Sequence, residues 1–138
     1  MNVNTLNMIL RLKEWEEELE KQKFINILSE RQKLEEYLRM LEERFSSLDF
    51  LKEATSVELL SIYDEMQYLL TQLKETREII KKIDDELEAQ RQVYEEAFKE
   101  RKKIEQLYDK LISRIKIHLE KLEEKLISDV FLSQVRSK

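Results

Sequence analysis

The sequence has 138 residues, of which 40% are charged and 41% are hydrophobic, and it contains no glycine, proline or cysteine. The missing residue types exclude glycine-rich phosphate loops, EF-hand loops, disulfides and thiolate metal sites from this sequence. High charge without helix breakers is typical of long, solvated helices. The net charge of −5 is unevenly distributed, because residues 1–100 are acidic whereas residues 101–138 carry 10 basic and 6 acidic side chains.

The first predicted helix runs from about Thr5 to Leu48. Its apolar residues recur every seven positions, which is the heptad period of a coiled coil, at Ile27, Leu34, Leu41 and Leu48. The helical pattern then weakens once, in the stretch FSSLDFLKEATSVE at residues 45–58. We therefore expect a turn at about 49–56, with room for a short helix inside it.

The second predicted helix runs from about residue 57 to residue 135. Thr55 and Glu58 have the spacing of a capping box, in which each side chain bonds the other residue's backbone N–H at a helix start. Ser56 is a competing N-cap residue. The heptad stripe continues along this helix, at Leu59, Met66, Leu73, Ile80, Leu87 and Tyr94. The two stripes predict an all-α fold, a long antiparallel two-helix coiled-coil hairpin in one domain over residues 1–138, whose second helix extends beyond the first.

The register of the hairpin is predicted from the same stripes. Folding the chain at the turn places Leu48 opposite Leu59 and Ile27 opposite Ile80, so that the residue numbers of each pair total 107. This register also brings together three pairs of opposite charge, which we interpret as register-setting pairs: Glu30 with Arg77, Lys23 with Asp84, and Glu16 with Arg91. In the same register Val3 reaches only Ile104, which leaves about the last 35 residues without a partner in the chain.

Close to the turn, an apolar patch flanks the predicted seam. It consists of residues that the predicted register brings to this end of the hairpin, namely Tyr37, Leu38, Phe45, Ile62 and Leu69. A contiguous apolar patch that is exposed to solvent marks a contact site. The alternative is that residues 49–55 fold back and bury the patch under Phe50 and Leu51.

The sequence offers no constellation of residues for catalysis. His118 is the only histidine, and its helical neighbours Arg114, Lys121 and Leu122 do not form a metal-ligand set. Acidic clusters such as DDELE are more often solvated helix faces than cation sites. The basic residues of the last third alternate with acidic ones, which argues against nucleic-acid binding. We therefore expect neither an enzyme nor a protein that binds a metal, a cofactor, a small-molecule ligand or nucleic acid.

Both ends of the chain resemble one known family. The N-terminal stretch LNMILRLKEWEEEL, with Leu12, Glu14 and Glu17, is similar to the N-terminal signature of the FliJ proteins of the bacterial flagellum. The stretches YEEAFKERKKIEQLYDK and EKLISD, followed by Arg136, are similar to the C-terminal helix of that family, through Ala97, Arg101, Lys102, Glu105, Leu107, Glu124 and Asp129. Val130 departs from the family pattern, in which an acidic residue is expected at this position. The related stalk proteins of virulence type III secretion systems share the architecture.

The resemblance implies a stalk protein of flagellar type III protein export, and hence a role in flagellar biogenesis and motility. Such a stalk sits in the hexameric export ATPase ring, promotes its assembly, contacts the cytoplasmic domain of the export-gate membrane protein and escorts export chaperones. The resemblance and the positive charge of the last third together assign the ring contact to Arg101, Lys102, Lys103, Lys110 and Arg114. They leave the gate contact to the apolar patch near the turn.

The sequence has neither the apolar core of a signal peptide nor an apolar run of the roughly 20 residues that span a bilayer. Together with the resemblance, this predicts a cytoplasmic protein that associates peripherally with the inner membrane at the flagellar base and is monomeric when alone. Two alternatives remain open. The chain could be the stalk protein of a virulence secretion injectisome, or a structural coiled-coil protein that forms homodimers through its long second helix.

Overall fold

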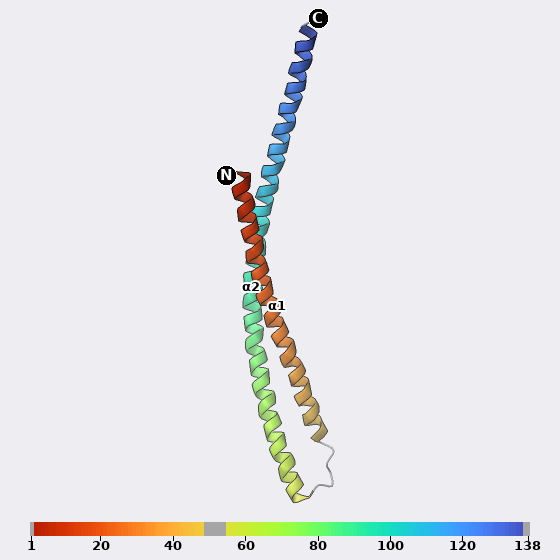
Figure 1. Ribbon diagram of the computed structural model, residues 1–138. Coiled ribbons are helices and arrows are strands. Elements are labelled where there is room, and N and C mark those ends of the chain that lie inside the picture. Colours follow the sequence, from red (N-terminus) through yellow and green to blue (C-terminus); the bar gives the residue numbers. More distant parts are fainter. Residues whose placement is uncertain (1, 49–54, 137–138) are drawn as a thin grey trace. The chain divides into compact units, whose positions relative to one another are not determined.

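The computed structural model describes residues 2–48 and 55–136 of the chain. These residues form two helices, α1 (Val3–Ser47) of 45 residues and α2 (Ser56–Arg136) of 81 residues. Figure 1 shows that α1 and α2 run antiparallel. None of the described residues forms a strand. The predicted all-α antiparallel hairpin with a longer second helix is therefore confirmed.

Both helices begin at a side chain that caps the free backbone N–H groups of the first turn. At the start of α1, the Oδ1 atom of Asn2 accepts a hydrogen bond of 2.7 Å from the backbone N–H of Thr5. At the start of α2, the N–H of Glu58 donates to Oγ1 of Thr55 at 3.3 Å, and the N–H of Thr55 donates to Oε2 of Glu58 at 3.1 Å. The predicted capping box is confirmed, and a cap of this kind stabilises a helix by about 1 kcal/mol. The predicted turn at 49–56 lies mostly outside the described residues.

The chain divides into two compact units, which we describe separately. The turn unit comprises Leu19–Glu95, and the end unit comprises Met1–Glu18 together with Glu96–Lys138. In each unit a stretch of α1 lies beside a stretch of α2 (Figure 1). The assignment of residues 1–138 to a single hairpin domain stays a prediction.

The core of the turn unit lies close to the ends of α1 and α2 that face the turn. Leu41, Leu69 and Leu73 are buried, with exposed fractions of 5% or less. Three half-buried apolar side chains pack against these leucines, namely Leu38, Phe45 and Leu48. Fully burying a leucine side chain contributes about 1.5–3 kcal/mol, so this cluster is the main apolar contribution to the stability of the turn unit.

Three ion pairs between α1 and α2 report the register of the turn unit. These pairs are Arg44–Glu65 at 3.1 Å, Glu42–Arg77 at 3.5 Å, and Arg31–Asp84. Their residue numbers total 109, 119 and 115. The centre of these values is about 114, which is one heptad above the predicted total of 107.

The observed register corrects the predicted one. Arg77 does not pair with Glu30, nor does Asp84 pair with Lys23, because each of the two has a different partner on α1. The physical reason is that two heptad stripes match each other equally well after a shift of seven residues. The shift also moves Leu59 out of the core position predicted for it, and its side chain is 53% exposed.

The core of the end unit is smaller. Leu6 and Leu10 on α1 are buried, and the α2 residues Ile104, Tyr108 and Leu111 are half-buried. Beyond Leu111, every described residue of α2 is exposed. The burial of α2 thus extends one heptad farther than the predicted limit at Ile104, in agreement with the shifted register.

Candidate partner-binding surface

The predicted ring-contact residues of the end unit differ in how available their charges are. The guanidinium of Arg101 donates hydrogen bonds to Glu17 on α1, at 2.6 and 3.4 Å, and to Glu105 on its own helix. It also lies 5.0 Å above the ring centre of Phe98. The hydrogen bonds to Glu17 and Glu105 raise the pKa of Arg101. With 18% of its side chain exposed, Arg101 holds α2 to α1 rather than offering its charge to a partner.

A second polar layer joins the helices next to this pair. The ammonium of Lys13 donates to Glu100 at 3.1 Å and to Glu16 at 3.3 Å, and these contacts, Glu100 first, raise the pKa of Lys13. On the outside of α2, Lys102 and Lys103 are exposed, with the Lys102 ammonium 5.3 Å from the Phe98 ring centre. The charges of these two lysines face solvent.

The remaining two predicted residues, Lys110 and Arg114, line an apolar groove between α1 and α2 of the end unit. The groove has a volume of about 340 Å³, and its other lining residues are Leu6, Ile9, Ile104, Leu107 and Leu111. Lys110 and Arg114 are both exposed. An apolar floor with basic side chains beside it suits an amphipathic partner segment that carries acidic residues.

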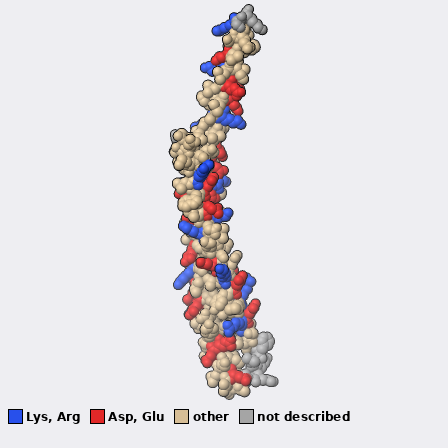
Figure 2. All heavy atoms as spheres, viewed as in Figure 1, with Lys and Arg blue, Asp and Glu red and all other residues tan. Residues whose placement is uncertain are grey.

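Past the groove, α2 has no neighbouring helix among the described residues and displays an apolar stripe. The stripe follows the i, i+3, i+4 spacing of one helix face. Its residues are between 38% and 65% exposed, and they are Ile112, Ile115, Leu119, Leu122, Leu126 and Val130. Figure 2 shows this part of α2 at the top of the view, with basic and acidic side chains beside uncharged surface. The stripe continues the seam that α1 covers up to Leu111.

The predicted gate-contact patch of the turn unit is largely core. Leu69 is fully buried, and Leu38 and Phe45 are half-buried against the same cluster. Ile62 is half-buried, whereas 38% of Tyr37 is exposed. The expectation of an exposed patch is therefore wrong for Leu69, which the shifted register turns into the seam. The alternative of a lid over the patch falls on residues that are mostly not described.

Other apolar side chains of the turn unit are exposed instead. Leu59, Tyr63 and Leu70 lie on one face of α2, at i, i+4 and i+11, and they are 53%, 58% and 43% exposed. The sequence did not single these residues out as a surface, because Leu59 belongs to the predicted heptad stripe. Their spacing beside the observed seam of Met66 and Leu73 is recognisable only once the register is known.

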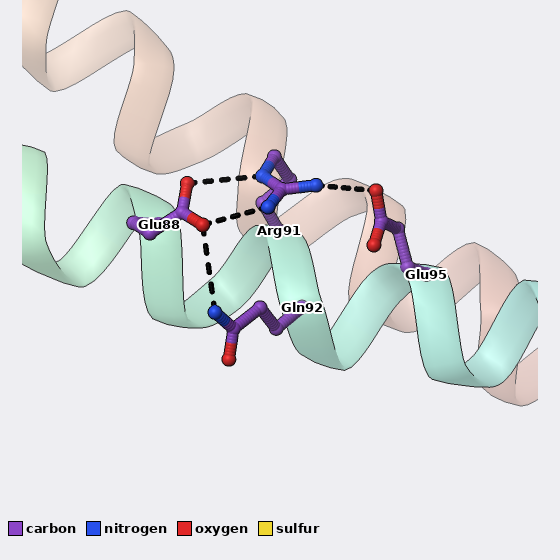
Figure 3. A network of polar contacts seen from close by, with 4 residues as sticks. All are labelled: Glu88, Arg91, Gln92 and Glu95. Carbon is purple, nitrogen blue, oxygen red and sulfur yellow. Dashed lines mark hydrogen bonds and ion pairs between the residues drawn. The ribbon is translucent and has the colours of Figure 1, made fainter.

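Figure 3 shows where the third predicted register pair departs from the structure. Arg91, which was expected to face Glu16, donates to Glu88 on its own helix at 2.6 and 3.0 Å and also to Glu95. Glu88 further accepts a hydrogen bond of 3.4 Å from Gln92. The contacts raise the pKa of Arg91 and lower that of Glu88. Glu16 forms an ion pair with Lys13 of its own helix.

A further polar contact joins α1 and α2 in the turn unit, besides the three ion pairs. The side-chain amide of Gln90 donates to the carboxylate of Glu20 at 2.6 Å and to the backbone carbonyl of the same residue at 3.0 Å. Lys23 donates to Glu20 at 3.1 Å. The hydrogen bond from Gln90 and the contact with Lys23 lower the pKa of Glu20. Lys23 is thus occupied on its own helix and not by Asp84.

Two further structural findings concern the residues at 2–48 and 55–136. No group of three or more histidine, aspartate or glutamate residues there is arranged to hold a metal ion. Neither helix contains, in its described part, a stretch long and apolar enough to cross a membrane.

The comparisons with known proteins give one match. A protein-family model described as "Flagellar FliJ protein" matches residues 1–136 of the sequence. The comparisons with curated proteins and with solved structures find no match. The matched residues include both helices, and therefore the groove and the exposed stripe of the end unit.

Proposed function

The chain belongs to the FliJ family of flagellar proteins, and on this ground we propose that it is a non-enzymatic stalk component of the flagellar type III protein export apparatus. In this role it sits in the hexameric export ATPase ring, links the ring to the membrane export gate and escorts export chaperones. It works in the cytoplasm, peripherally associated with the inner membrane at the flagellar base. The family match over residues 1–136 is the observation that carries the proposal.

The ring contact is assigned to the groove of the end unit and to the exposed lysines beside it. Lys110 and Arg114 combine with an apolar floor, and Lys102 and Lys103 add exposed charge on the same helix. Arg101 supports this surface from within, because its bonds to Glu17 keep α1 in place as one wall of the groove. Charged contacts of this kind speed association and are sensitive to salt.

The gate contact is assigned to exposed apolar residues of the turn unit. Tyr37 of the original patch remains exposed, and Leu59, Tyr63 and Leu70 form an exposed face on α2. Leu69, Leu38 and Phe45 are left out of this assignment because they pack in the core. Aromatic residues among exposed apolar neighbours are the kind of surface that protein interfaces use as anchors.

The assignment of the ring contact is tested with the purified export ATPase. The double variant Lys110→Glu/Arg114→Glu should lose most of the stimulation of ATP hydrolysis that the unaltered protein gives at low salt. The matched control, Lys81→Glu/Lys82→Glu, makes the same charge change at two exposed lysines of the turn unit and should keep the stimulation. Equal stimulation by both variants would show that the groove does not contact the ring.

The role in export is tested in cells. In a flagellated bacterium that lacks its own protein of this family, the gene for this chain should restore filament growth and swimming, and the groove variant should not. Secretion of hook and filament proteins into the medium provides the direct measurement. Restored secretion through a virulence injectisome, with none through the flagellum, would contradict the flagellar assignment.

A further inference from the structure

The exposed stripe of α2 is an unpartnered coiled-coil seam. From Ile112 to Val130 it keeps helical spacing, yet each of its apolar side chains is at least 38% exposed. A single helix of mixed composition is only marginally stable in water, and most of its stability has to come from packing of its apolar face. A second helix with an apolar face and complementary flanking charges would supply that packing.

We propose that this stripe pairs, antiparallel, with the same stripe of a second copy of the chain. In a register that pairs the two central leucines, Leu119 lies opposite Leu122 of the second copy, Ile115 lies opposite Leu126, and Ile112 lies opposite Asp129. By the two-fold symmetry of the pair each of these layers occurs twice. Leu111 and Val130 lie at the two ends of the overlap.

The charges that flank the stripe complement one another in this register. In an antiparallel pair, the residues on the same side of the two seams face each other, two positions away from the core layers. This places Lys116 beside Glu123 of the second copy on one side of the seam. By symmetry this contact occurs twice, which gives two ion pairs. His118 lies beside Lys125 of the second copy on the other side of the seam.

A parallel pair lacks this complementarity. With the two copies in register, every residue of the seam faces itself, so that Asp129 would be placed against Asp129 of the second copy. In addition, Lys116 and Glu123 would no longer lie side by side. The charge pattern of α2 therefore favours the antiparallel arrangement.

The size of the overlap sets the strength of the pair. The overlap from Leu111 to Val130 spans 20 residues, or about 30 Å of helix. An interface of this length falls in the size class of weak, reversible complexes, well below that of obligate dimers. We expect monomers in dilute solution and dimers of twice 16.9 kDa as the concentration rises.

The pair is tested by sedimentation equilibrium over a wide concentration range, with two neighbouring glutamates as matched sites. Glu123→Lys turns two attractive contacts into repulsive ones and should weaken the dimer by about tenfold. Glu124→Lys makes the same charge change one residue away on the outer face and should leave the dissociation constant unchanged. The exchange Lys116→Glu/Glu123→Lys restores opposite charges across the symmetric pair and should recover the original affinity. Circular dichroism checks that all three variants keep their helix content.

The direction of the pair is tested with spin labels, since the sequence has no cysteine that would react elsewhere. Labels on Ser113→Cys in both copies should lie more than 20 Å apart in the antiparallel pair, because the labelled positions are about 15 residues out of line. A mixture of chains labelled at Ser113→Cys and at Ser128→Cys should give a short distance. A chain that stays monomeric at every concentration, an equal effect of the two glutamate variants, or a short distance with Ser113→Cys alone would each overturn the proposal.

Discussion

Arg101 of α2 donates a hydrogen bond of 2.6 Å to Glu17 of α1, and less than a fifth of either side chain is exposed to solvent. The pair is thus a partly buried ion pair that joins the two helices of the end unit. On α1, Glu17 lies one heptad after the buried Leu10. Leu6 and Leu10 provide the buried apolar packing of the end unit, and the Arg101–Glu17 pair fixes how α2 is aligned against α1 there.

Removing one partner of this pair should destabilise the end unit. Arg101→Gln leaves the Glu17 carboxylate without its strongest donor in a shielded position, so we expect a loss of about 1 kcal/mol in the free energy of unfolding. Lys102→Gln, which removes an exposed charge from the neighbouring residue, should cost less than half of that. Urea unfolding followed by circular dichroism measures both values. Equal stability of the two variants would contradict the role assigned to Arg101.

The stability of the turn unit should fall in acid partly through Glu20. Hydrogen bonds from Gln90 and Lys23 lower the pKa of Glu20 in the folded chain below its value in the unfolded chain. A carboxylate with a depressed folded pKa contributes stability that is fully present above the unfolded pKa and is lost as the pH falls through the folded pKa.

This effect separates from general acid denaturation by comparison of two variants. In Glu20→Gln the side chain no longer titrates, so its free energy of unfolding should fall less than that of the unaltered chain between about pH 6 and pH 3. Glu86→Gln alters an exposed glutamate of the same unit and should retain the original pH dependence. Identical pH profiles for all three proteins would mean that Glu20 makes no special contribution.

The buried leucines near the turn should be essential for stability and not for partner contact. Leu69→Ala opens a cavity in a fully buried site and should reduce the free energy of unfolding by about 2–5 kcal/mol. Leu70→Ala removes the same atoms from a side chain that is 43% exposed, and should cost about 1 kcal/mol or less. If Leu69→Ala instead left stability intact and abolished only the binding of a partner, Leu69 would belong to a contact surface.

Local features of this fold could be predicted from the sequence, and long-range ones could not. The capping box of Thr55 and Glu58 depends on four consecutive residues, and the sequence predicts it correctly. The heptad stripes also predict two helices of unequal length. The register depends on a comparison between distant stripes whose repeat is seven, so that totals of 107 and 114 give equally good apolar layers.

The candidate site shows the same division. The sequence predicts a basic surface in the last third, and Lys110 and Arg114 do lie together beside an apolar groove. It could not predict that Arg101 is neutralised by Glu17, because that contact joins residues 84 positions apart. The placement of Leu69 in the core likewise follows from the register. The sequence alone does not show whether Arg101 or Leu69 contacts the other helix, because that depends on the register.

The register itself provides the last prediction, because it assigns one of two possible partners to Asp84. In the structure Asp84 accepts hydrogen bonds from Arg31, whereas the predicted register pairs it with Lys23. A double-mutant cycle with Arg31→Ala and Asp84→Ala should show a favourable coupling in urea unfolding that decreases as salt is added. Glu35 also contacts Arg31, and the cycle removes this contribution, since it is present in both backgrounds.

The control cycle combines Lys23→Ala with Asp84→Ala and should show no coupling, since the ammonium of Lys23 binds Glu20 on its own helix. The two cycles share one variant, Asp84→Ala, so any change in helix propensity at residue 84 affects both equally. A coupling found only in the cycle with Lys23 would move the register back by one heptad. In that register Leu59 would lie in the core and Leu69 would be exposed, so the partner of Asp84 also decides which of these two leucines is buried.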